Sequence, residues 1–383
     1  MTQDTDSLIR WLIGEGRLLG EAVPIVRGYC DRLLAMGVPL SRVRIGQSYA
    51  NPLLSAWGIV WTPDRTKRYN VAAEVLETPA WQGSPFEHVV TTRRPVRQRL
   101  KGVDLSGAHP VYAELAQSGA TDFLAMPLEY GDGTVQGSSF STEAPEGFTE
   151  AQIRALRDSR NALASALEPV AMRESQKSLL RTYLGDGPAR EIGQGRIKRG
   201  ETRAVSAAIL FADLRGYTAR TDRLPETQVL SLLGEFFDLI VTEVQHQGGD
   251  ILKFMGDGVL AMFEATPDPA EACNAALRAS ANALTAMRKR GTDAPDQLPF
   301  VIGLDFGQVT LGNIGSPDRL DFTVVGSTVN RASRVQGVCK DLGEHALVTA
   351  AVADHASEFD LHPIGAQDLR GLHQPVDLFR LPL

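Results

Sequence analysis

The sequence predicts an α+β protein whose chain divides into two halves joined by a polar connector. Short apolar or alternating runs bounded by Gly, Pro or Asp, which are typical of strands, occur in both halves. Longer segments carry apolar residues at three-to-four spacing, which is typical of amphipathic helices. A chain of 383 residues with 43% apolar content can build two or three domains with substantial cores. We expect one module at 1–172, a linker at 173–202 and a second module at 203–383.

The first half begins with helical patterning and continues with strand-like runs. Apolar residues from Leu8 to Leu34 recur at helical spacing up to Gly37. Strand-like runs follow at residues 42–45, 57–61 and 123–128. Thr149 and Gln152 form a capping-box pattern that opens a closing helix. Linker residues 179–184 contain a short helical pattern, followed by Gly185 and Gly187.

The second half predicts the order strand, helix, strand, strand, helix, strand, which suggests a ferredoxin-like core with additions at its end. Pro225 starts the first helix, and Gly248 followed by Gly249 ends it. Asp257 and Gly258 are a hairpin signal between two strands, and Asp268 opens the second helix. The expected strands are residues 205–211, 251–254, 259–263, 300–304 and 309–314, with a further helix at 328–342.

Composition excludes several classes of protein. The formal net charge of -7 argues against a nucleic-acid binder, which would carry a basic surface. The three cysteines, Cys30, Cys273 and Cys339, are widely spaced, which favours reduced thiols. The N-terminus lacks the basic and apolar regions of a signal peptide, and no apolar run approaches the roughly 20 residues that cross a bilayer. We therefore expect a cytoplasmic protein without membrane or nucleic-acid partners.

Two carboxylates are expected at one edge of the predicted second sheet. Asp213 follows the strand that ends at residue 211, and Asp257 lies in the predicted hairpin turn. Carboxylate pairs suit hard divalent ions, and two such ions can activate an attacking oxygen and stabilise a transferring phosphoryl group. An Asp-Gly pair in a hairpin is, by itself, more often only a turn.

Three separated motifs give this pair its context. They are FADLRGYT at 211–218, KFMGDG at 253–258 and DFTVVGSTVNRASR at 321–334. In order, residue type and spacing they resemble the catalytic domain of class III adenylyl and guanylyl cyclases. The resemblance covers nearly all of the second half and implies a nucleotide cyclase that uses two divalent metal ions, Mg²⁺ or Mn²⁺.

The resemblance also implies roles for individual residues. Asp213 and Asp257 match the two metal-binding aspartates, and the backbone at Leu214 belongs to the same metal site. Asn330 and Arg334, four apart on one helix face, match the catalytic pair that orients the ribose and stabilises charge on the α-phosphate. The loop that holds the triphosphate matches Leu214, Gly216, Tyr217 and Thr218.

Base selection departs from the commonest family pattern. Lys253 matches the purine-contacting lysine of adenylyl cyclases, but the position of its usual aspartate partner is Thr323. The threonine hydroxyl can accept from the adenine amino group while the lysine donates to a ring nitrogen. This combination favours ATP as substrate, and a guanylate cyclase of the same fold is the alternative.

The family builds each active site from two subunits. Each chain here carries one copy of the metal aspartates and one copy of the base-contacting and catalytic residues. The resemblance therefore implies a head-to-tail homodimer with two complete sites. Arg370 is a further basic residue that either helps to hold the terminal phosphates or lies at the surface.

The first half resembles a GAF-like sensory domain only in its order of elements. We expect it to dimerise and regulate the cyclase, and a small-molecule ligand is possible. Three features leave a ligand-binding and a structural interpretation open: the basic residues Arg93, Arg94, Arg97, Arg99 and Lys101, the lone His88, and the tryptophans Trp57, Trp61 and Trp81.

Two other classes were weighed. The triplet Gly248, Gly249, Asp250 looks like part of a diguanylate cyclase signature, but Ile251 and Leu252 break that pattern. A catalytically silent sensor or scaffold is disfavoured because all the expected catalytic positions are filled.

Overall fold

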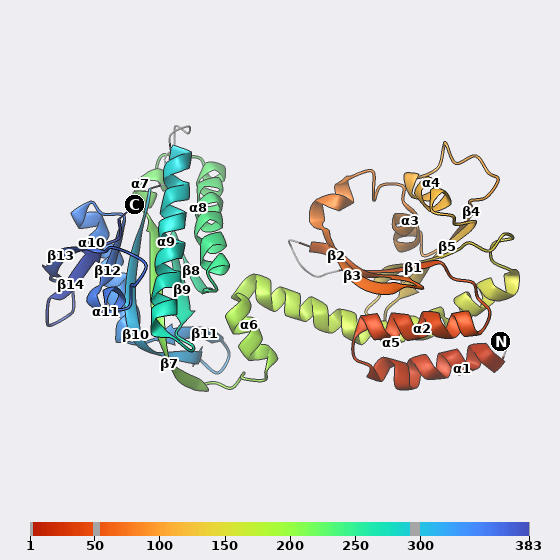
Figure 1. Ribbon diagram of the computed structural model, residues 1–383, viewed down its shortest axis with the longest axis horizontal. Coiled ribbons are helices and arrows are strands. Elements are labelled where there is room, and N and C mark those ends of the chain that lie inside the picture. Colours follow the sequence, from red (N-terminus) through yellow and green to blue (C-terminus); the bar gives the residue numbers. More distant parts are fainter. Residues whose placement is uncertain (1–2, 49–53, 292–298, 383) are drawn as a thin grey trace. The chain divides into compact units, whose positions relative to one another are not determined.

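The computed structural model describes residues 3–48, 54–291 and 299–382, and it contains two compact units (Figure 1). The first unit is Met1–Leu179 and the second is Leu180–Leu383. Each unit combines one β-sheet with helices, so the predicted α+β class is confirmed. Within the described residues, no helix is both long and apolar enough to cross a membrane.

The first unit is built on a six-stranded sheet with the order β3-β2-β1-β6-β5-β4, in which each neighbouring pair is antiparallel. The strands are β1 (Arg42–Ser48), β2 (Leu54–Thr62), β3 (Arg65–Ala72), β4 (Val96–Arg99), β5 (Asp122–Glu129) and β6 (Val135–Thr142).

Helices cover both faces of this sheet. The main core lies between one face and α1 (Gln3–Trp11), the π-helical turn Leu12–Gly16, α2 (Ala22–Ala35) and α5 (Glu150–Leu184). On the other face lie α3 (Pro85–Thr92), α4 (Pro110–Gln117) and the 3-10 turn Ala73–Glu77. Because successive strand residues face opposite sides, the two faces have separate cores.

Helix α5 joins the two units in sequence. The predicted capping box is present, since the Thr149 amide donates to Gln152 Oε1 at 2.9 Å and the Gln152 amide donates to Thr149 Oγ1 at 3.3 Å. The helix continues past residue 172 to Leu184, so residues 179–184 are its last turns and not a separate helix. It ends where Gly185 adopts a left-handed backbone with φ 88°.

Several first-half residues for which a ligand-binding role was left open make structural contacts. Arg97 pairs with the fully buried Asp122 at 2.8 Å, and Arg99 pairs with the same carboxylate at 3.4 Å. Trp57 and Trp61 are buried in the main core. His88 is exposed on helix α3 and does not lie in a strand.

The second unit contains an eight-stranded sheet with the order β13-β14-β12-β10-β7-β9-β8, and β11 pairs with β10. Six of its elements, in chain order, are β7 (Thr202–Leu214), α8 (Glu226–His246), β8 (Asp250–Met255), β9 (Gly258–Glu264), α9 (Pro269–Gly291) and β10 (Phe300–Gly315). This order, with β10-β7-β9-β8 side by side, is the predicted ferredoxin-like core, which is confirmed.

The remaining elements extend this core. They are α6 (Asp186–Gly193), α7 (Tyr217–Thr221), β11 (Leu320–Val325), α10 (Ser327–Leu342), β12 (Ala346–Thr349), α11 (Ala350–Ala353), β13 (His362–Gln367) and β14 (Val376–Arg380). Helices α8 and α9 pack together on one face of the sheet (Figure 1), and α10 packs on the other.

Two details differ from the sequence prediction, and a third agrees with it. The expected strands at 300–304 and 309–314 are one continuous strand, β10, because Gly307 stays in the sheet and leaves room for Thr328, whose Oγ1 would lie 2.7 Å from an added Cβ. The β8–β9 turn consists of Gly256 and Asp257, since Met255 already pairs with Gly258. Asp268 does cap α9, accepting from the Ala270 amide at 2.9 Å.

The alternation of side chains along β7 determines which face carries the site. Ala208, Leu210 and Ala212 point into the core beneath α8 and α9. Ile209 belongs to the core on the α10 face. Asp213 has the same parity as Ile209, so its carboxylate lies on the α10 face.

Candidate active site

Asp213 and Asp257 lie at one rim of the second sheet. Asp213 is next to last in β7 and pairs with Gly258 of β9, while Asp257 is in the turn that precedes Gly258. Gly256 makes this tight turn possible with φ 63°. Partial burial and the nearby charge of Asp213 both raise the pKa of Asp257. The expected proximity of these two carboxylates is therefore present.

The residues at this rim fit a divalent cation of the magnesium type. No group of three or more His, Cys, Asp or Glu side chains gathers around a common point in the described ranges. Mg²⁺ usually needs only one or two protein carboxylates, since water and substrate phosphates complete its shell. Leu214 could contribute only through its backbone, because its side chain is buried.

Two side chains of α10 also reach Asp213. Gln336 donates through Nε2 to Asp213 Oδ2 at 3.1 Å, and Lys340 forms an ion pair with the same oxygen. Neither residue is among those predicted from the sequence. The two residues are four apart in a helix that was predicted at 328–342, so they lie on one face of it. This spacing is the signal that could have indicated that they act together.

Asn330 and Arg334 lie on a different face of α10. At about 100° per residue, Arg334 is roughly 200° around the helix from Gln336. Both Asn330 and Arg334 are exposed, and Arg334 has no ion-pair partner within residues 3–48, 54–291 and 299–382. A single chain therefore does not bring the predicted catalytic pair, Asn330 and Arg334, to Asp213 and Asp257.

The predicted phosphate loop leaves β7 directly after Asp213. Gly216 has a left-handed backbone with φ 70°, and it precedes the short helix α7. Arg215 anchors the loop, since its guanidinium donates to the carbonyl oxygens of Cys339, at 3.0 Å, and Glu344. Tyr217 packs against the apolar core, whereas Thr218 is exposed.

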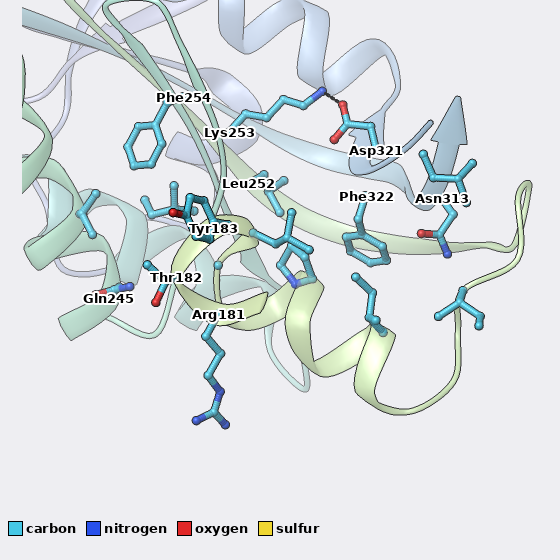
Figure 2. Close-up of a pocket in the computed structure, with 18 residues that line it drawn as sticks. Arg181, Thr182, Tyr183, Gln245, Leu252, Lys253, Phe254, Asn313, Asp321 and Phe322 are labelled. Atoms are coloured by element: carbon cyan, nitrogen blue, oxygen red, sulfur yellow. Dashed lines mark ion pairs between the residues drawn. The ribbon is translucent and has the colours of Figure 1, made fainter. Parts of the chain in front are cut away.

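Lys253 lines a cavity of about 550 Å³ in the second unit (Figure 2). Its ammonium forms an ion pair with Asp321 of β11, a residue to which the sequence analysis assigned no role. The walls include Tyr183, Phe254 and Phe322. The volume lies in the range of about 300–1,000 Å³ that is usual for small-molecule sites.

Two more residues that were predicted to bind substrate, Thr323 and Arg370, do not line this cavity. Thr323 is half-buried in β11, where it pairs with Gly312 of β10. Arg370 is exposed in the connection between β13 and β14. Neither residue is among those that line the cavity beside Lys253.

Comparison with known proteins agrees with this geometry. Residues 201–381 match the model of the adenylate and guanylate cyclase catalytic domain. The uncharacterized protein MT1361 of Mycobacterium tuberculosis is 32% identical over 241 residues, which is 60% of this chain and 40% of that protein. The uncharacterized protein Rv1320c of the same species is 33% identical over 219 residues, covering 55% of this chain and 37% of that protein. The chain thus spans about two fifths of the length of these relatives.

Solved structures of similar proteins include cyclases of both nucleotides. A bacterial light-regulated adenylyl cyclase is 25% identical, with a TM-score of 0.42, over 47% of this chain and 91% of that chain. The guanylyl cyclase Cya2 is 25% identical, with a TM-score of 0.40, over 48% of this chain and 94% of that chain. Residues 201–381 of this chain belong to the class III adenylyl and guanylyl cyclase family.

Proposed function

We propose that the chain is an adenylate cyclase that converts ATP to 3′,5′-cyclic AMP and pyrophosphate, with two divalent metal ions, at the interface of a homodimer. The observation that carries the proposal is the placement of Asp213 and Asp257 at one sheet rim, where partial burial and the charge of Asp213 raise the pKa of Asp257. Such a pair is stabilised by divalent cations, whose remaining coordination positions substrate phosphates can fill.

The reaction forms one bond and breaks one bond at the α-phosphorus. The ribose 3′-oxygen loses its proton and attacks, and the bond to the pyrophosphate oxygen breaks. Bound Mg²⁺ or Mn²⁺ would lower the pKa of the 3′-hydroxyl and neutralise charge on the phosphates. Asp213 and Asp257 would hold the cations, and the Gly216 loop would bring backbone amides to the triphosphate.

The catalytic pair would come from the second subunit. Asn330 and Arg334 are exposed and face away from the aspartates of their own chain. In a head-to-tail dimer, the guanidinium of Arg334 would stabilise charge on the α-phosphate, and Asn330 would orient the ribose. This arrangement accounts for a catalytic arginine that has no ion-pair partner within the described part of its own chain.

Lys253 supports ATP as the substrate. Its ammonium can donate to a ring nitrogen of adenine, and the Thr323 hydroxyl can accept from the amino group. An ammonium has no acceptor for the donor edge of guanine. The ion pair with Asp321 positions the Lys253 ammonium at the cavity of about 550 Å³. We place the reaction in the cytoplasm, where ATP is available.

Product analysis tests the proposal. The full chain is incubated with ATP or GTP and with Mg²⁺ or Mn²⁺, beside Asp257→Ala and the exposed control Asp360→Ala. We expect cyclic AMP from ATP, abolished in Asp257→Ala and retained in Asp360→Ala. Cyclic GMP as the main product would overturn the role of Lys253, and activity that survives Asp257→Ala would overturn the metal site.

We also propose that the first unit regulates the second through helix α5. Its sheet and helices form a separate core, and α5 runs from that core into the second unit. Deleting residues 1–149 leaves α5 whole and should change turnover or dimer affinity. Identical kinetics and assembly would contradict a regulatory role.

A further inference from the structure

The first unit contains a cavity of about 220 Å³ between its sheet and the segment that carries α3 and α4. The sheet contributes Arg42 and Arg44 of β1, Tyr69 of β3, and two serines of β6. The covering segment contributes Trp81, Phe86 and His109. None of the described residues that line the cavity is acidic.

Two arginines form the charged floor of this cavity. Arg42 and Arg44 are two apart on β1, so they face the same side of the sheet, and they pair with Ser141 and Ser139 of β6. Both serines are buried, and their hydroxyls can donate to an anion. The floor therefore presents guanidinium and hydroxyl donors together.

Neither arginine has a carboxylate partner in the described part of the first unit, where the ion pairs involve other residues. The Nε of Arg44 is buried and has no hydrogen-bond partner there. Burial and the charge of Arg44 lower the pKa of Arg42, and the opposing influence of Tyr69 and Glu114 offsets this only in part. An unpaired guanidinium that is partly desolvated is costly, so a bound anion would stabilise this floor.

Aromatic rings form the walls. The guanidinium carbon of Arg44 lies 4.9 Å from the centroid of the Tyr69 ring and 5.5 Å from that of Phe86. Phe86 can lie this close to the sheet because Gly46 and Gly137 have no side chains there. A Cβ added at Gly46 would lie 2.9 Å from the ring of Phe86, and one added at Gly137 would lie 2.3 Å from it.

Both ring nitrogens of His109 already have hydrogen-bond partners in the protein backbone. Its Nδ1 accepts from the Val111 amide at 3.2 Å, and its Nε2 lies 3.0 Å from the carbonyl oxygen of Pro79, to which it donates. These two backbone partners occupy both nitrogens of the ring. The positive charge of the cavity therefore comes from the two arginines.

We propose that this cavity binds a small aromatic carboxylate, with the carboxylate at Arg42 and Arg44 and the ring between Tyr69, Phe86 and Trp81. The planar guanidinium fork matches a carboxylate in two hydrogen bonds. A volume of about 220 Å³ is below the range of about 300–1,000 Å³ that drug-sized ligands occupy, which favours a single-ring acid over a nucleotide. The inference does not depend on the cyclase activity.

Isothermal titration calorimetry on the full chain tests this inference. The probes are benzoate, 4-hydroxybenzoate and phenylacetate, with benzamide as the neutral isostere of benzoate and inorganic phosphate as the anion without a ring. We expect saturable binding of at least one aromatic acid, with benzamide and phosphate at least tenfold weaker. Binding of none of the three acids, or equal binding of benzoate and benzamide, would overturn the proposal.

Single substitutions test whether the aromatic acid binds at Arg44. Arg44→Gln should weaken the best acid at least tenfold, and Arg94→Gln, an exposed arginine of the same unit, should leave its affinity unchanged. If Arg44→Gln does not fold, Arg44→Lys keeps the charge but loses the fork and should still weaken binding severalfold. Unchanged affinity in a folded Arg44 variant would show that the acid binds elsewhere and would overturn the site.

Discussion

Lys340 of α10 forms an ion pair with Asp213 of β7 across 127 positions of sequence. The paired oxygen, Oδ2, also accepts from Gln336. In our proposal the same carboxylate holds a divalent cation, so the ammonium and the cation compete for one oxygen. Helix α10 therefore carries two groups of polar side chains, one directed at its own chain and one exposed.

Removal of this ammonium should tighten metal binding. Both partners are partly exposed, so we expect an electrostatic effect of about 1 kcal/mol, which is roughly fivefold in affinity. Lys340→Met should therefore bind Mn²⁺ about fivefold more tightly in calorimetry, while Lys289→Met, exposed on α9, should match the native chain. Unchanged or weaker Mn²⁺ binding by Lys340→Met would contradict competition at Asp213.

Mixing two inactive variants should restore activity if the site is shared between subunits. Asp257→Ala removes a metal ligand and Arg334→Ala removes the catalytic guanidinium, so we expect each homodimer to lose at least about a hundredfold in turnover. A random mixture contains half heterodimers, and each heterodimer has one intact site of two. Cyclic AMP production should recover to roughly a quarter of the native value. If the mixture stays as inactive as its parts, both roles would belong to one subunit.

Asp321 should matter for base selection more than for stability. The Lys253 and Asp321 side chains are 34% and 47% exposed, so their ion pair should contribute less than about 1 kcal/mol to folding. The carboxylate nevertheless directs the ammonium within the cavity. We expect Asp321→Asn to lower kcat/KM for ATP about fivefold, with little change for GTP, and to unfold at the native temperature. The control is Asp318→Asn, which is exposed in the turn before β11. An unchanged ratio of ATP to GTP turnover would remove Asp321 from base selection.

Local signals were sufficient to place Asp213 and Asp257 at one edge of the predicted sheet. Asp213 ends an apolar strand and Asp257 lies in a hairpin, and the order of elements places β7 beside β9. The strand and helix order of the second unit followed from the same periodicities. Predictions of this kind succeed where a few neighbouring residues determine the local structure.

Long-range contacts were not predictable in this way. The reach of Gln336 and Lys340 to Asp213 depends on the rotation of α10 against the sheet, which no local pattern specifies. The two strands expected at 300–304 and 309–314 are one strand, β10, and Gly307 within it leaves room for Thr328. The cavity at Arg42 and Arg44 joins β1 to a segment that lies far from it in the sequence.

The buried Asp305 should make stability depend on pH. Burial raises the pKa of this carboxyl above its ordinary value, although Thr349 and Arg331 donate to it at 2.6 Å each. A folded pKa above the unfolded one favours the protonated folded state, so this contribution to stability is present in acid and is lost as the pH rises through the folded pKa. The free energy of unfolding of the native chain should therefore fall with rising pH, relative to Asp305→Asn, from about pH 4 upward, by at most about 1.4 kcal/mol per pH unit. Parallel pH profiles of the two proteins in urea unfolding would contradict the raised pKa.

The contact between α10 and β10 should tolerate no added methyl group. A Cβ at Gly303 would lie 2.3 Å from the amide nitrogen of Gln336 and 2.6 Å from the carbonyl oxygen of Ala332, and backbone atoms cannot rotate away as a side chain can. We expect Gly303→Ala to destabilise the second unit by about 1–3 kcal/mol or more. Its turnover should also fall, because a displaced α10 moves Gln336 from Asp213.

Gly337→Ala is the matched control, since its Cβ would meet nothing within 4 Å and alanine stabilises a helix interior by about 0.5–1 kcal/mol. Thermal unfolding should order the three proteins with Gly303→Ala lowest and Gly337→Ala level with the native chain or above it. A Gly303→Ala protein as stable as the native chain would mean that α10 packs less closely on β10 than the structure shows.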